Sequence, residues 1–113
     1  MRTPKSLPQS ILAKRVPLDR IGVAEDGWSR LDVRRLIQEL GGTRTAILGG
    51  DVYSVTDDLI EPAYANWHSD PVEGELSVSF IARSHHETLA YVDRYPDPED
   101  GSVLYVLVFK DFD

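Results

Sequence analysis

Residues 45–62 read TAILGGDVYSVTDDLIEP and hold the main signals for the fold. The β-prone runs TAIL and, at residues 52–55, VYSV flank a pair of glycines, so they predict either a hairpin or one long strand with a glycine bulge. The pair Asp57 and Asp58 then predicts a tight turn. Because Pro62 cannot donate a ladder hydrogen bond, the arm after this turn is expected to be an edge strand.

Downstream of this stretch, the sequence predicts an extended loop, a helix, a turn and a central strand. The loop contains Pro71 and mixes polar with aromatic residues, the helix has apolar residues at helical spacing, and the last run is almost continuously apolar. Ser77 or Ser79 is expected to cap the helix. In order, these elements are expected at residues 63–74, 79–95, 96–101 and 103–109.

Upstream, the clearest helix begins after Ser29, whose hydroxyl can cap the backbone amide of Asp32, and it ends before two glycines that follow Leu40. A shorter helix is expected over residues 8–15, ended by Pro17. Together these elements predict an α+β fold, in which two or three helices flank a mainly antiparallel sheet of three to five strands. No linker or repeat is visible, so residues 1–113 are expected to form a single domain.

The composition limits where the protein works and what it binds. The chain has no cysteine, which excludes disulfides and thiolate chemistry, and it has no apolar run long enough for a signal peptide or a membrane span. We therefore expect a cytoplasmic protein that does not bind membranes. The formal net charge of −7 argues against direct binding of nucleic acid, because affinity for phosphate backbones comes largely from Lys and Arg.

Charge is distributed unevenly along the chain. Residues 1–44 contain nine Lys or Arg and five Asp or Glu, whereas residues 45–113 contain three and fourteen. Such asymmetry can produce a one-sided field that attracts a basic partner. The alternative is an even spread of charge over the surface, since folding can undo a linear asymmetry.

The sequence predicts no catalytic residue, no cofactor and no metal site. It lacks the Gly-x-Ser-x-Gly motif of serine hydrolases, the phosphate-binding loop and the spaced histidines of a zinc helix. Asp51 is interpreted as a turn or hydrogen-bonding residue, His85 as a residue at the border of the core, and His86 as solvated. The alternative is a small metal-dependent hydrolase or ligand-binding enzyme that uses Asp51, His68 and Asp70.

Acidic and aromatic residues alternate through the predicted turn and loop after residue 56. This mixture is typical of an interface in which aromatic side chains anchor a partner and carboxylates attract its positive charge. Trp67 can also be a core residue that pins its loop. The predicted partner-binding residues are Asp57, Asp58, Glu61, Tyr64, Asn66, Trp67, Asp70 and Glu73.

Three segments resemble a known family. ILGGDVY at residues 47–53, IEPAYANW at residues 60–67 and YVDRY at residues 91–95, the last at the end of a helix, are similar to immunity protein family 40 of bacterial polymorphic toxin systems. The resemblance extends from about Ile11 to Phe109 with the elements in the same order. The chain departs from the family pattern at two places. It has Asp57-Asp58 at the turn where Asp-Gly is expected, and it has Ala65 where a polar residue is commoner.

This resemblance implies a small cytoplasmic α+β protein that inhibits a toxin and is not an enzyme. The expected partner is a cognate toxin domain, and a basic one would suit the acidic chain; nucleases with basic clefts are such toxins. If the protein works by binding, the alternative to a toxin inhibitor is a structural adaptor of a secretion apparatus. The oligomeric state is left open by the sequence.

Overall fold

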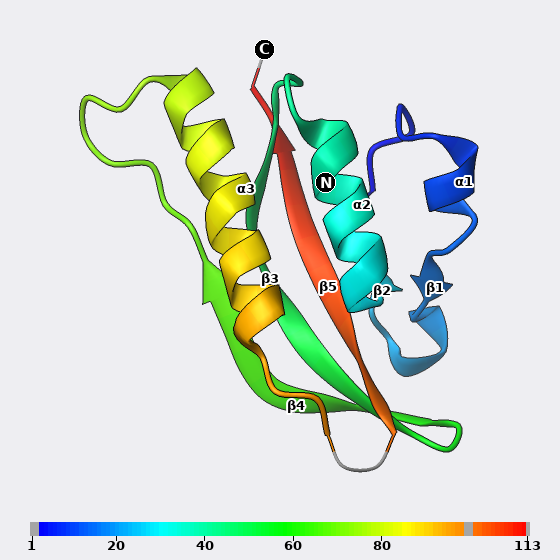
Figure 1. The fold of residues 1–113 in the computed structure, drawn as a ribbon. Helices are drawn as coiled ribbons and strands as arrows, with labels where there is room; N and C mark the ends of the chain where they lie inside the picture. Colours follow the sequence, from blue (N-terminus) through cyan, green and yellow to red (C-terminus); the bar gives the residue numbers. More distant parts are fainter. Residues whose placement is uncertain (1–2, 99–100, 113) are drawn as a thin grey trace.

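The computed structural model describes residues 3–98 and 101–112, in which five strands form one antiparallel sheet of order β1-β2-β5-β3-β4. Two helices, α2 and α3, lie side by side across one face of this sheet (Figure 1). The predicted α+β fold is therefore confirmed. The strands are β1 Val16–Pro17, β2 Asp26–Trp28, β3 Thr45–Thr56, β4 Leu59–His68 and β5 Ser102–Asp111. The helices are α1 Gln9–Leu12, the 3-10 turn η1 Asp19–Ile21, α2 Arg30–Leu40 and α3 Ser77–Arg94.

The alternative left open at the double glycine is resolved as one long strand. β3 continues through Gly49 and Gly50, and its register against β5 shifts between Ile47 and Gly49, which marks a bulge at Leu48. A Cβ atom on Gly50 would lie 2.2 Å from the carbonyl oxygen of Val106 and 2.5 Å from the Trp67 ring. The glycine is required because the neighbouring strand and this indole approach the β3 backbone so closely.

The predicted tight turn joins β3 to β4, and Asp57 adopts the left-handed conformation there with φ of 55°. β4 is an edge strand, as Pro62 predicts. The extended loop predicted over residues 63–74 is wrong in its first half, because β4 continues to His68. Ala63, Ala65 and Trp67 alternate toward the helices, and this period of two is hard to recognise because alanine favours strands weakly.

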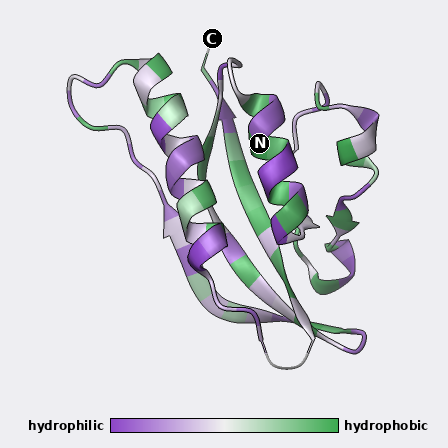
Figure 2. Ribbon diagram, in the orientation of Figure 1, coloured by the Kyte–Doolittle hydropathy of each residue, from purple (hydrophilic) through white to green (hydrophobic). Residues whose placement is uncertain are grey.

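β5 is the central strand of the sheet, as its apolar run predicts, and Figure 2 shows it coloured as hydrophobic along most of its length. Ser29 caps α2 as predicted, accepting a hydrogen bond from the Asp32 amide. The predicted cap of α3 is wrong. This helix begins at Ser77 after Leu76, and among the described residues no side chain makes a capping hydrogen bond at its N-terminus.

The N-terminal segment differs most from the prediction. The short helix is confirmed only as the single turn α1, and Pro17 belongs to strand β1 instead of ending a helix. β1 and β2 are too short to show a periodic pattern in the sequence. The segment also covers part of the sheet face opposite α2 and α3, where Leu18 packs with Leu104 and Val106.

The predicted turn at residues 96–101 includes 99–100, which lie outside the described residues. Across the described parts of the chain, none of the helices has the length and apolar character that crossing a membrane requires.

Candidate functional site

The outer edge of the sheet presents an exposed aromatic side chain. β4 pairs with β3 through Val52–Ala65 and then Tyr53–Pro62, so Ala63 and Tyr64 form a bulge that interrupts the ladder. Tyr64 has φ of 58°, and its side chain is 92% exposed. A left-handed conformation is unfavourable for a bulky residue, and such residues collect at functional sites. We therefore take the edge formed by β4 and the loop after it, residues 59–76, as the candidate site and name it the β4 edge.

The backbone of this edge is unsuited to pairing with another strand. Pro62 has no N–H to donate, and the bulge at Tyr64 breaks the regular spacing of donors and acceptors. A partner would therefore contact side chains along the β4 edge, because a continuous ladder cannot form there. Leu59, Val72 and Leu76 add exposed apolar surface at the two ends, with exposed fractions of 59, 61 and 68%.

The predicted acidic residues lie in two groups at opposite ends of β4. Asp57, Asp58 and Glu61 are exposed around the hairpin tip, and Asp70 and Glu73 are exposed in the loop after His68. β4 has ten residues, and at about 3.3 Å per residue it separates the two groups by about 30 Å. The structure thus spreads these carboxylates along one edge, with Tyr64 between them.

An ion-pair network holds the loop of the β4 edge against α3. Arg83 contacts Glu75 at 2.9 Å and Glu87 at 3.0 Å, and its guanidinium also donates to the carbonyl of Asp70. Ser69 donates to Glu87 at 2.6 Å. The hydrogen bonds from Arg83 and from the Val72 amide lower the pKa of Glu75 to about 2. The pKa of Glu87 is lowered by Ser69 and then by Arg83. These contacts hold the loop after β4 against α3, although the loop itself has no regular secondary structure.

Trp67 and Asn66 point to opposite faces of the sheet, so the structure does not bring together all the predicted partner-binding residues. The half-buried Trp67 ring stacks on Tyr91 with centroids 4.6 Å apart, and its Nε1–H donates to Thr88 Oγ1 at 3.0 Å. This packing is the alternative given for Trp67, a residue that pins its segment to the core. Asn66 is exposed on the helix-free face, where its register partner is Asp51.

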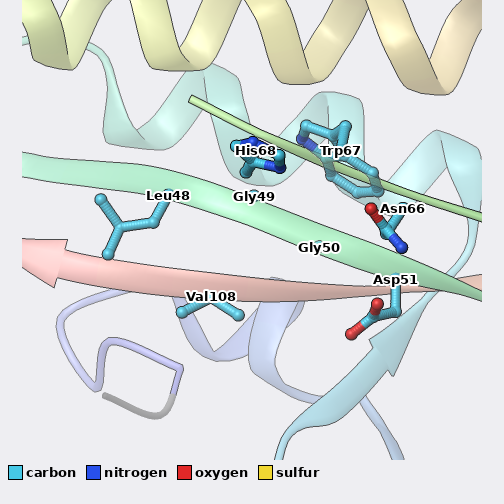
Figure 3. A pocket seen from close by; sticks show the side chains of 8 residues that line it. All are labelled: Leu48, Gly49, Gly50, Asp51, Asn66, Trp67, His68 and Val108. Carbon is cyan, nitrogen blue, oxygen red and sulfur yellow. The ribbon is translucent and has the colours of Figure 1, made fainter. Parts of the chain in front are cut away.

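A hollow of about 250 Å³ lies beside the β4 edge and is lined partly by the glycines of β3 (Figure 3). Asp51 and Asn66 lie next to each other on β3 and β4, and Val108 of β5 forms another wall. His68 also lines the hollow, and its Nε2 is 3.8 Å from the carboxylate of Asp70. Within residues 3–98 and 101–112, no three side chains of His, Asp or Glu are grouped as metal ligands would be.

Sequence comparison places these elements in a family. The family model described as Immunity protein 40 matches residues 17–109, which extend from β1 into β5 and include the whole β4 edge. This chain belongs to the Immunity protein 40 family. Membership implies that this immunity protein neutralises a toxin, and it confirms the family suggested by the three sequence segments. Neither the curated proteins nor the solved structures contain a match.

For this immunity protein, the sequence predicted which residues belong to the β4 edge, but it did not predict how they are arranged in space. It identified the carboxylates in the turn and in the loop, but it placed Tyr64, Asn66 and Trp67 in the loop, whereas they belong to β4. The bulge and the exposure of Leu59 depend on how β4 pairs with β3. Asp51 was interpreted as a turn or hydrogen-bonding residue, and the structure shows that it lies within β3, exposed, and not in a turn. His85 borders the core, where its Nε2 lies 2.7 Å from the Thr45 carbonyl oxygen, and His86 is exposed, both as predicted.

Proposed function

We propose that this immunity protein works in the cytoplasm as a non-catalytic inhibitor that binds a cognate bacterial toxin domain along the β4 edge. The observation that carries this proposal is Tyr64, an aromatic residue that is almost fully exposed at a left-handed position of an edge strand. Because Tyr64 is so exposed, burial of its ring within the protein does not offset the cost of this conformation. Aromatic residues that become buried on binding are frequent energetic anchors of protein interfaces.

The charge of the β4 edge supports a basic partner. Several carboxylates of the C-terminal half are paired with arginines: Glu75 and Glu87 with Arg83, Asp93 with Arg34, and Asp97 with Arg30. Among the described residues, the carboxylates at the hairpin tip and that of Glu73 form no such pair. Unpaired carboxylates on both sides of Tyr64 would attract a positively charged surface. A toxin nuclease, whose cleft binds phosphates, would offer such a surface.

Co-expression with the toxin domain encoded immediately upstream tests the proposed function. We expect cells to survive only when both proteins are made, and we expect the two proteins to purify as one complex. Growth arrest despite folded immunity protein would contradict toxin neutralisation by this pair. Survival without a complex would contradict inhibition by direct binding.

A charge variant then tests the role of the hairpin tip. Replacing its three carboxylates with Ser should lower the association rate roughly three- to tenfold at low salt and flatten the dependence of that rate on salt concentration. Glu39→Gln, at an exposed position of α2, serves as the control for the loss of a carboxylate outside the β4 edge. An unchanged association rate would exclude the tip from the interface. The variant carries Asp57→Ser, Asp58→Ser and Glu61→Ser.

A further inference from the structure

The hollow next to the β4 edge has a floor without side chains, for a structural reason. A Cβ atom on Gly49 would lie 2.3 Å from the carbonyl oxygen of Trp67 and 2.8 Å from the Cα atom of His68. This position can therefore carry no side chain on the helix-free face, because the strands pack too closely; Gly50 instead faces the Trp67 ring on the helix side. The close packing leaves a depression on the helix-free face of the sheet, beside the area where Val16, Leu18 and Val23 of the N-terminal segment pack.

The wall of this hollow combines one carboxylate, one amide, the imidazole of His68 and apolar surface. Asp51 is exposed and forms no ion pair among the described residues, and its register partner Asn66 presents a carboxamide beside it (Figure 3). The side chains of Leu48 and Val108 line the rest of the hollow. A long side chain with an aliphatic stem and a cationic end matches this arrangement, because the stem can cover apolar surface while the charge meets a carboxylate.

The surroundings of Asp51 are negatively charged. Burial raises the pKa of the neighbouring Tyr53 hydroxyl, and the charges of Asp51 and Glu25 raise it further, so both carboxylates act on this part of the helix-free face. In the part of the chain that the structure describes, no Lys or Arg lines the hollow. An incoming cation would therefore gain an unpaired carboxylate without displacing a positive side chain of the protein.

We propose that this hollow receives an arginine or lysine side chain of the toxin, with Asp51 as its counter-charge and Asn66 as a hydrogen-bond acceptor. The inference rests on the proposed function and adds a specific contact to it. The hollow adjoins β4 on the helix-free face, so a toxin that covers Tyr64 can place a projecting basic side chain there. The contact extends the interface from the β4 edge onto the sheet.

The affinity of the toxin complex tests this contact. Asp51→Asn removes the charge and keeps the size of the side chain, and it should raise the Kd about tenfold, as expected for the loss of a charge-assisted hydrogen bond. Asn66→Tyr, which fills the hollow without changing the charge, should weaken binding to a similar extent. Glu39→Gln, which lies on α2, should leave the Kd unchanged. If Tyr64→Ala weakens the complex and both hollow variants bind like the wild type, the inference is overturned and the proposed function stands.

A second measurement does not require the toxin. In a nuclear magnetic resonance titration of the isolated protein, N-acetyl-arginine amide should shift the amide signals of Gly49, Gly50 and Asn66, whereas the neutral isostere N-acetyl-citrulline amide should not. Asp51→Asn should abolish the arginine-specific shifts. Equal shifts from both probes would refute a cation site in the hollow. Absence of toxin binding by the wild-type protein would instead overturn the proposed function.

Discussion

Replacing Tyr64 with glycine should affect folding and binding in opposite directions. The left-handed conformation at φ of 58° costs a non-glycine residue roughly 1–2 kcal/mol. Glycine removes this strain, but it loses about 0.5–1 kcal/mol more conformational entropy on folding. Because the ring is 92% exposed, its removal sacrifices almost no packing. We expect Tyr64→Gly to stabilise the isolated protein by about 0.5–1 kcal/mol.

The same substitution should weaken the toxin complex. An aromatic anchor at the centre of an interface contributes about 2 kcal/mol or more, so the Kd should rise about 30-fold. Urea unfolding of the isolated protein and calorimetric titration with the toxin domain measure the two effects. A variant that is stabler and binds more weakly would show that the strain at Tyr64 is retained for binding.

Tyr64→Ala separates the side chain from the backbone. Alanine also lacks the ring but keeps the conformational strain, so it should lose the same affinity as glycine and gain no stability. Tyr64→Phe keeps the ring and should bind nearly as well as the wild type. Equal stability of the glycine and alanine variants would refute the strain argument, and unchanged affinity of both would remove Tyr64 from the interface.

Further predictions concern the framework that positions the β4 edge. Thr88→Val leaves the Nε1–H of Trp67 without its acceptor and should lower the free energy of unfolding by about 1–3 kcal/mol, measured by urea unfolding. Gly50→Ala places a methyl group 2.2 Å from a carbonyl oxygen of β5, so we expect a loss of at least about 2 kcal/mol and a lower Tm; a melt like that of the wild type would contradict the close packing. Glu75→Gln removes a carboxylate whose pKa is lowered to about 2 by Arg83, so the variant should be less stable than the wild type at pH 7. That difference should shrink as the pH falls from about 4.5 toward 2, because a lowered folded-state pKa contributes stability only while the carboxylate is ionised; urea midpoints at pH 7, 4 and 2.5 test this, and a difference independent of pH would contradict it.

The sequence by itself determined the fold class and most of its long elements. The apolar run of β5, the capped helix α2 and the edge position of β4 could all be predicted, because each follows from local residue preferences. Ser29 and Pro62 are signals of this kind, whereas Gly49 and Gly50 left a hairpin and one long strand equally open. The sequence likewise identified the carboxylates and Tyr64 of the candidate site, because acidic and aromatic residues alternate there.

Only the tertiary structure decided how these residues are presented. The bulge that exposes Tyr64 exists because β4 pairs with β3 in one register, and a register is a relation between segments that neither segment contains. For the same reason the packing of Trp67 against Tyr91 and Thr88 could not be told from an exposed role. The hollow beside Asp51 likewise arises from the close approach of three strands, in which residues distant along the chain become neighbours.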